Sequence, residues 1–317
     1  YSDYDNHTAI ILKDTRPGTT NVLGFKPGDP IDCNILIDDD NDKVYIYFTD
    51  GITPPKKIEI DHAKTLTNSE FTFDDVSVIV KPPIFPPKIT PNTTENDLER
   101  KNNMKEKFLM FGYRYKYKDN QYSAVSPFSP VAFLPENYKF NFEDHVLECM
   151  VNIYDNVDIT FNTGDVNVKE VDLLFKETNE NLIYLAKSFN KSDEGFNDNE
   201  EQTYNFSNNQ IYKVLPEKEI FRLYDNVPLT AKTQEIINNR LVYGNYTENY
   251  DLIDESGDEV IPSIDLKYSQ NVTELNMAVQ SVKSNRDYEI GIVYLDDHGR
   301  STTVLSYETA IFIYLGL

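Results

Sequence analysis

Short runs of alternating apolar and polar residues recur along the chain, and they are rich in Val, Ile, Tyr, Phe and Thr. A period of two is typical of strands that bury one face, whereas the spacing of an amphipathic helix is scarce here. The pattern therefore predicts an all-β protein. The predicted strands are Asp32–Asp38, Lys43–Thr49, Phe108–Lys118, Val168–Phe175, Leu182–Ser188, Arg240–Tyr246 and Tyr288–Leu295.

Four polar tetrapeptides beside these runs predict tight turns. Asn, Asp and Gly tolerate the positive φ values that hairpin turns require, so each turn should join two antiparallel strands. The predicted turns are Asp39–Asp42, Lys118–Gln121, Thr178–Asn181 and Asp296–Gly299.

The predicted strand Phe108–Lys118 carries large side chains with unusual regularity. Tyr113, Tyr115 and Tyr117 share one face, and the Arg and Lys residues that follow each of them share the other. Pairing shifted by one residue would exchange an aromatic face for a cationic one, so the register should be well defined. We expect the three tyrosines to anchor a domain core or a contact between subunits.

The segment after the Lys118–Gln121 turn is predicted to pair back as the second strand of a hairpin. Two Ser-Pro steps should end that strand, because proline cannot donate to a sheet ladder and restricts the residue before it. Phe128 lies between the two steps and is a further candidate anchor of a core or an interface. The remaining candidate anchors are Tyr243 and Tyr246.

With 317 residues, the chain is long enough for two or three domains. The segment Lys81–Asn96 holds five prolines, which favour extended conformations and indicate a boundary. A second boundary is predicted near Lys213–Glu219. The block between them has the size and strand rhythm of an immunoglobulin or fibronectin type III sandwich, and Glu99–Lys107 before it is either a short helix or a polar lead-in.

Two stretches outside this block are built alike. Lys43–Ile60 and Asn239–Leu252 each pass from an apolar strand through a polar turn into another short strand, as hairpins of β-propeller blades do. We therefore expect propeller-like segments that belong together, with the sandwich inserted between them. The expected domains are residues 1–95 (propeller-like), 96–218 (fibronectin type III-like sandwich), 219–275 (return to the propeller-like segment) and 276–317 (start of a further sandwich). The final run AIFIYLGL suggests a piece of a longer polypeptide.

The net charge of the chain limits the classes of partner that it can bind tightly. Asp and Glu number 53 against 30 Lys and Arg, a formal charge of −23 that disfavours tight binding to phosphate backbones. Hydrophobic residues make up 39%, enough for packed cores rather than disorder. No run approaches the ~20 apolar residues of a membrane-spanning helix.

The residues give little sign of chemistry. The only cysteines, Cys33 and Cys149, are far apart, which excludes a four-cysteine zinc site within one chain, and we interpret both as buried thiols. The four histidines form no closely spaced pair. The acidic run at Asp38–Asp42 lacks the Gly and Glu of a calcium loop, and no complete catalytic motif occurs. We therefore expect no enzyme activity, cofactor or metal.

Five phrases are spread over most of the chain: YFTDGITPPKKIEI (Tyr47–Ile60), VIVKPPIFPPKI (Val78–Ile89), YRYKYKDNQYSAVSPFSPVAF (Tyr113–Phe133), LYDNVPLTAKTQEIINNRLVYGNYTENYDL (Leu223–Leu252) and SNRDYEIGIVYLDDHGRSTTV (Ser284–Val304). Together and in this order they resemble the tail nozzle proteins of short-tailed bacteriophages, also described as tail stabilisation or muzzle proteins, particularly those of crAss-like phages. None of the phrases is a catalytic signature, so the resemblance depends on their combination.

The resemblance implies a structural protein of the virion at the distal end of a phage tail, with propeller-like and fibronectin type III-like domains. It further implies a homo-oligomeric ring of six or twelve copies that contacts other tail proteins and lets DNA pass during genome ejection. The acidic composition fits this role, because an acidic wall repels DNA where a basic wall would hold it.

Two other functions stay open on the residues alone. The first is a secreted or surface-attached bacterial β-sandwich module that binds glycans through exposed tyrosines, although the chain has no tryptophan for such a surface. The second is a hydrolase with a carboxylate pair that no motif identifies.

Overall fold

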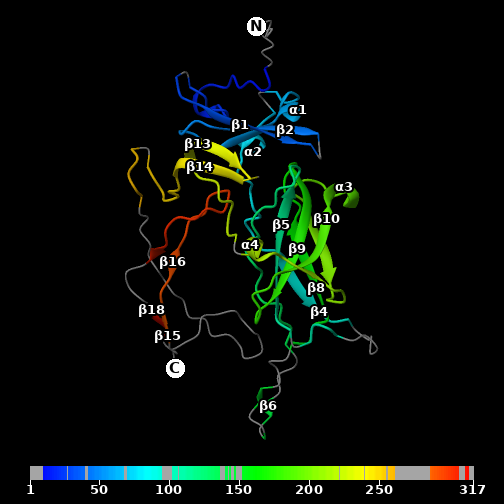
Figure 1. The fold of residues 1–317 in the computed structure, drawn as a ribbon. Coiled ribbons are helices and arrows are strands. Elements are labelled where there is room, and N and C mark those ends of the chain that lie inside the picture. The colour runs from blue at the N-terminus through cyan, green and yellow to red at the C-terminus, as the bar shows by residue number, and fades with distance from the viewer. Residues whose placement is uncertain are drawn as a thin grey trace. The chain divides into compact units, whose positions relative to one another are not determined.

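Several small antiparallel sheets carry the fold of the computed structural model (Figure 1). Strands make up 39% and helices 8% of the residues, and no helix reaches seven residues, so the prediction of a mainly β protein is confirmed. The structure describes residues 10–26, 28–39, 42–67, 70–94, 102–105, 107–135, 140–141, 143, 146–147, 152–220, 222–238, 240–254, 256–260, 286–306 and 311–313. Two compact units divide the chain: residues 1–247 with 297–299, and residues 248–296 with 300–317.

The first sheet contains three antiparallel strands in the order β1-β2-β3: β1 (Asp32–Asp38), β2 (Lys43–Thr49) and β3 (Lys56–Glu59). Asp38 pairs with Lys43 across the predicted turn, and Asp42 in that turn has the positive φ of 53° that tight turns demand. On one face, the sheet packs on a core of Leu23, Phe48, Phe71 and Val76. That layer includes the segment before β1 and three short helices: η1 (Gly18–Thr20), α1 (Ile60–Ala63) and α2 (Phe73–Val76).

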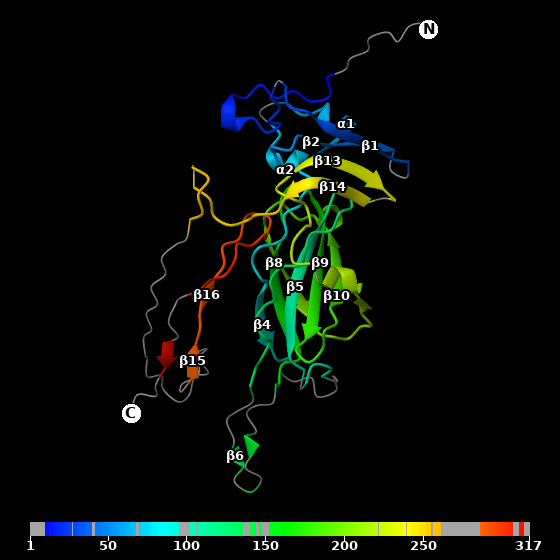
Figure 2. The same ribbon diagram turned by 60° about the vertical axis from the view of Figure 1, so that its left-hand side comes forward.

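The other face of this sheet packs on a second hairpin, made by β13 (Thr230–Ile237) and β14 (Arg240–Thr247). The contact includes Val78, Ile79 and Val227, with Tyr47, Leu241 and Tyr243 packed against them. Backbone and side-chain bonds join the two: the Thr49 hydroxyl donates to the Ala231 carbonyl at 2.5 Å, and the Gln234 amide donates to Asp32 Oδ2 at 2.9 Å. Figures 1 and 2 both show β13 and β14 beside β1 and β2. We call residues 10–80 and 222–247 together the flanking module.

Two sheets that share one core lie between these segments in the sequence. One has the order β12-β10-β9-β5 and the other β11-β8-β4. Their strands are β4 (Lys88–Asn92), β5 (Leu109–Tyr117), β8 (Asn156–Asn162), β9 (Val168–Glu177), β10 (Tyr184–Asn190), β11 (Glu201–Phe206) and β12 (Lys213–Val214). We call residues 88–94 and 102–215 the sandwich module. It begins with β4, before residue 96, because the proline-rich segment supplies an edge strand. Pro91 pairs opposite Val157 there, at an edge, where a missing N–H is tolerated.

Aromatic side chains from both sheets fill the sandwich core. Phe111 of β5 meets Phe206 of β11 edge to face, with ring centroids 5.3 Å apart, and Phe161 of β8 lies 5.2 Å from Phe189 of β10. Such ring pairs add stability beyond the area that they bury. The alternation of β8, which buries every second residue, follows from its place between two partners with one face on this core.

A turn at Asp50–Thr53 connects β2 to β3 in the flanking module. Asp50 accepts hydrogen bonds from the Ile52 and Thr53 amides at 2.9 and 2.7 Å and from the Thr53 hydroxyl at 2.8 Å. Burial favours the neutral carboxyl, but these bonds outweigh it and lower the pKa of Asp50. Gly51 has a φ of 74°, and a Cβ on it would lie 3.0 Å from the Lys232 side chain, so glycine suits both the turn and the close approach of β13.

The remaining elements are short. They are β6 (Phe140–Asn141), β7 (Val146–Leu147), α3 (Lys191–Glu194), α4 (Glu217–Ile220), β15 (Arg286–Tyr288), β16 (Gly291–Ile292), β17 (Leu305–Ser306) and β18 (Ile311–Ile313). The predicted strand Tyr288–Leu295 is broken: its first residue ends β15, which pairs with β18, and β16 pairs with β17. The predicted turn Asp296–Gly299 is closed by a bridge from Leu295 to Ser301.

Two expectations need correction, and one open alternative is narrowed. The described residues form no propeller or closed sheet: the flanking module stacks a three-stranded sheet on a two-stranded hairpin, too few strands to close a ring. Cys33 is exposed, because β1 turns its side chain, with those of Ile35 and Ile37, to a side that the described residues leave open; Cys149 lies outside the described residues. Of the two alternatives for Glu99–Lys107, the described residues fit the polar lead-in: the Asn102 side chain accepts from the Met104 and Lys105 amides in a turn, while residues 99–101 and 106 lie outside the described residues.

Within the described part of the chain, no helix has the length and apolar composition to cross a membrane.

Candidate functional site

The tyrosine face of β5 lies in the sandwich core. Tyr113, Tyr115 and Tyr117 are 4%, 8% and 8% exposed, and Tyr113 contacts the rings of Tyr115 and Phe161. Their hydroxyls keep polar partners at the edge of the core: Tyr115 donates to the Asn162 carbonyl at 3.3 Å and Tyr117 to the Lys81 carbonyl at 2.7 Å. Burial raises the pKa of Tyr115 and Tyr117. These tyrosines therefore pack within one chain.

The other candidate anchors differ in exposure. Phe128 is half-buried, packs beside Leu174 and Leu215, and lies under the Lys176 ammonium, 4.3 Å from the ring centroid. Tyr243 packs against the Val78 and Val227 cluster of the flanking module, and burial raises its pKa. Tyr246 is 54% exposed, because it faces outward near the end of β14. Of the six candidates, three are therefore buried (Tyr113, Tyr115 and Tyr117), two are half-buried (Phe128 and Tyr243) and Tyr246 is exposed.

The cationic face of β5 is covered rather than open to solvent. The Arg114 side chain is 8% exposed, and its Nε donates to Asp172 Oδ2 of β9 at 3.0 Å. A second nitrogen of Arg114 pairs with Glu219 of α4, and the guanidinium stacks on Tyr122, 4.0 Å from the ring centroid. Asp172 also accepts from the Ser188 hydroxyl at 2.5 Å. The charges of this face therefore fix α4 on the sandwich.

The segment Ser123–Ala132, which we call the serine strap, runs along the open edge of β5. It is not the second hairpin strand that the sequence predicted. Every third residue of the strap meets every second residue of β5, and each serine hydroxyl accepts from a β5 amide at 3.0 Å. The pairs are Ser123 with Tyr115, Ser126 with Tyr113, and Ser129 with Phe111; in each, the serine amide donates back to the carbonyl of the β5 residue at 2.7 to 2.9 Å.

The composition of the strap explains how this edge is closed. Serine is the smallest side chain that both donates and accepts, and each strap hydroxyl donates to the carbonyl of the residue after it. The two prolines follow serines at positions whose amides the pairing does not use. The strap therefore satisfies the backbone groups that an edge strand would otherwise offer to another chain.

Ser126→Ala is expected to destabilise the sandwich module by about 1 to 3 kcal/mol, because it leaves the buried Tyr113 amide without an acceptor. Urea unfolding or thermal unfolding of the variant measures the loss. Ser192→Ala, at an exposed position of α3, is the matched control and should change stability by less than about 0.5 kcal/mol. Equal stability of the two variants would mean that the strap hydroxyls are dispensable.

A polar cluster ties the sandwich to the returning segment of the flanking module. Arg222 donates to the Tyr122 carbonyl at 2.8 Å and pairs with Asp225. Asp225 in turn accepts from the Val80 amide at 3.0 Å. Burial lowers the pKa of Arg222, and the nearby Arg114 charge adds to this effect. The cluster joins the segment after β5 of the sandwich to both segments of the flanking module.

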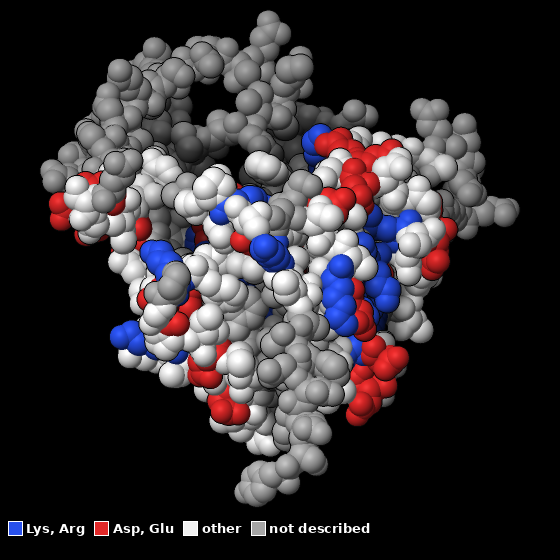
Figure 3. All heavy atoms as spheres, turned by 90° about the horizontal axis from the view of Figure 1, so that it is seen from above, with Lys and Arg blue, Asp and Glu red and all other residues white. Residues whose placement is uncertain are grey.

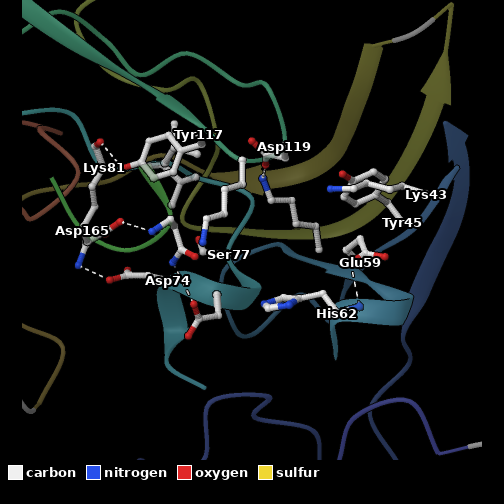
Figure 4. A pocket seen from close by; sticks show the side chains of 16 residues that line it. Lys43, Tyr45, Glu59, His62, Asp74, Ser77, Lys81, Tyr117, Asp119 and Asp165 are labelled. Carbon is white, nitrogen blue, oxygen red and sulfur yellow. Dashed lines mark hydrogen bonds and ion pairs between the residues drawn. The ribbon is translucent and has the colours of Figure 1, made fainter. Parts of the chain in front are cut away.

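A cavity of about 220 Å³ lies where the flanking module meets the sandwich (Figure 4). Strands β2 and β3, helices α1 and α2 and the turn after β5 line it. Two ion pairs close its sides: Lys57 pairs with Asp119, and Lys81 with Asp74 at 2.6 Å. Burial, together with the charges of Asp119 and Glu59, raises the pKa of Tyr45 in the wall to about 12.

Sequence reasoning missed this cavity. Its lining residues Lys43, His62, Ser77 and Lys118 come from four separate segments, and each is ordinary in its local context. No motif could have indicated it, because only the packing of the two modules brings the segments together. His62 is exposed at its position in α1, and its side chain extends into the cavity in Figure 4.

Metal chemistry has little support in the described part of the chain, where no three His, Cys, Asp or Glu side chains gather closely enough to hold an ion. On the face in Figure 3, acidic and basic side chains are interspersed rather than separated into two surfaces. A scan against models of known protein families found no match, and a search of curated protein sequences found no significant match.

Proposed function

We propose that this protein is a structural component of a bacteriophage tail, in the ring at the distal end through which DNA is ejected. The sequence phrases suggest the family. The observation that carries the proposal is the order of the modules along the chain. Two segments far apart in the sequence pack as one flanking module, and the sandwich is inserted between them. This is a construction for stacking β modules, with an aromatic core and a strapped edge rather than a reactive cleft.

The finer assignment of the domains belongs to the same proposal. The sandwich module has seven strands in two sheets, the strand number of a constant-type immunoglobulin or fibronectin type III domain. We assign β1–β3 and β13–β14 as propeller-like blades that neighbouring elements of the assembled tail would complete. The resemblance sets the number of copies at six or twelve.

An exposed apolar row on β1 supports assembly with other copies. Ile35 and Ile37 are each 64% exposed beside the exposed Cys33, on the same face as the core residue Phe48 of β2. The core of the flanking module is therefore open along β1. Exposed apolar rows of this kind are typical of protein contacts, and a neighbour in a ring would cover this one.

The test is imaging. The full-length protein is expected to form closed rings in electron micrographs, and a tag on it should label the tail tip of intact virions. Ile35→Asp should prevent ring formation while the monomer stays folded, because the side chain is exposed in the single chain. Ile211→Asp, at a fully exposed isoleucine in the sandwich module, is the control and should leave the rings intact. Failure to label the tail would overturn the tail role; intact rings with Ile35→Asp would overturn only the β1 contact.

The acidic-wall hypothesis needs the assembled ring. The face in Figure 3 carries both signs of charge, so the acidity of a channel depends on which face lines it. A map of the electrostatic potential on a reconstructed ring is expected to show an acidic lumen, and a basic lumen would contradict the idea that the wall releases DNA.

A second candidate is a binding module, and the polar cavity between the two modules favours it. A glycan array with the intact chain would test the saccharide version of this alternative.

A further inference from the structure

The carboxylates that line the cavity are already engaged within the chain. Glu59 accepts from the Asp61 and His62 amides, Asp74 from Lys81, Asp75 from Thr72 and Asn167, Asp119 from Lys57 and the Gln121 amide, and Asp165 from the Asn167 amide. Each carboxylate therefore has at least one donor of its own. Their positions are fixed by caps, turns and ion pairs, and none of these five groups needs a ligand to satisfy it.

Four donor side chains of the cavity are in the opposite situation. Among the described residues, the Lys43 and Lys118 ammonium groups and the His62 imidazole have no hydrogen-bond or ion-pair partner. Ser77 is 1% exposed, and its hydroxyl has no partner in the described part of the chain. A buried hydroxyl without a partner is costly, and such a group in a native protein calls for an explanation. Figure 4 shows Lys43 and His62 extending into the cavity from β2 and α1, across from Ser77.

We propose that this cavity binds a small organic carboxylate. The Ser77 hydroxyl and the ammonium groups of Lys43 and Lys118 would donate to the carboxylate oxygens, since charge-assisted bonds of this kind are strong. The ring of Tyr45 and the side chain of Ile79 in the same lining offer apolar contact to the rest of the ligand. The site does not depend on the tail role, and it would give the second candidate function, a binding module, a class of ligand.

The charge balance selects a monoanion over a dianion. The lining holds four lysines against five carboxylates, so its net repulsion is larger for a doubly charged phosphate than for a single carboxylate, which can sit beside the unpaired ammonium groups. The bound carboxylate could belong to a free small molecule or to the Asp or Glu side chain of a neighbouring polypeptide. Both use the same donors and are distinguished by experiment.

The test is an NMR titration of the isotope-labelled full chain at constant ionic strength. Sodium butyrate is expected to give saturable shifts of the amides of residues 77–81, inorganic phosphate weaker ones, and n-butanol none. Ser77→Ala and Lys118→Gln should each weaken butyrate binding about tenfold, the value of one charge-assisted hydrogen bond. Lys105→Gln is the matched control, at an exposed lysine just before the start of β5, and it should bind butyrate as the unmodified chain does.

Ser77→Ala is expected to stay folded, so that weaker binding by this variant reports on the cavity. The Ser77 hydroxyl has no partner within the described chain, so Ser77→Ala should keep or raise the melting temperature. A capped peptide with one glutamate that binds more tightly than butyrate would identify a polypeptide side chain as the ligand, and butyrate alone would identify a free molecule. Absence of saturable shifts, equal binding of phosphate, or unchanged affinity in both cavity variants would overturn the proposal.

Discussion

Tyr113→Ala is expected to lower the free energy of unfolding of the sandwich module by about 3 to 5 kcal/mol. The side chain is 4% exposed and touches the rings of Tyr115 and Phe161, with centroids 5.8 and 6.1 Å away. Its removal loses the transfer energy of a large aromatic group and leaves a cavity between two sheets that cannot close around it. Because the chain has more than one module, hydrogen exchange of the β5 and β9 amides in urea is the appropriate measurement.

Tyr246→Ala is the matched control for this prediction. The substitution is the same, but Tyr246 is 54% exposed, so the loss should stay below about 1 kcal/mol. The contrast separates core anchors from residues that only a subunit contact would bury. If both substitutions cost the same in the monomer, the tyrosine face of β5 would not be the core that its burial indicates.

Asp172→Ala is expected to cost about 3 to 5 kcal/mol, because it leaves the buried Arg114 without its partner on β9. The lost bonds are the 3.0 Å bond from Arg114 Nε and the 2.5 Å bond from the Ser188 hydroxyl. The guanidinium then keeps only the partly exposed Glu219 as an ionic partner, and a buried charge that loses its buried partner is more costly than one at the surface. Thermal unfolding, with hydrogen exchange in α4 as a second readout, measures the effect.

Two comparisons sharpen this test. The double substitution Arg114→Met with Asp172→Leu should recover most of the loss, since apolar residues often replace a buried pair without cost. Glu201→Ala breaks an exposed pair with Lys88, whose side chain is 74% exposed, and should cost less than about 1 kcal/mol. A double variant as unstable as Asp172→Ala would show that the pair itself stabilises the module.

Period-two patterning located most strands because each of them buries one face. The bounds predicted for β1 and β2 are those of the structure, and those of β5, β9, β10 and β14 differ from it by at most two residues at either end. The same rule failed for the serine strap, since its period of three does not match a strand and the β5 amides bond to serine hydroxyls instead of backbone carbonyls. It also failed for Cys33, because strand alternation says which residues share a face and not whether a second layer covers that face.

The cavity lay beyond any pattern in the sequence. Its polar groups become a set only when β2, α2 and the turn after β5 meet, and that meeting depends on contacts between modules. The edge strand β4 illustrates a related limit. Five prolines indicated a boundary, but one of them, Pro91, lies within a paired strand. An edge strand tolerates proline because a residue there can have no N–H to donate on its open side.

The inserted sandwich also sets the order in which the protein can be completed during synthesis. Thr49 and Ala231, which bond across the flanking module, are separated by 182 positions. At about 5 to 20 residues per second, a ribosome needs about 10 to 35 seconds to make the stretch between them. During that time the face of the first sheet that carries Tyr47 is not yet covered by the β13–β14 hairpin, while the sandwich is synthesised and folds. Chaperones that shield apolar surfaces on nascent chains would therefore act on this segment before β13 and β14 are made.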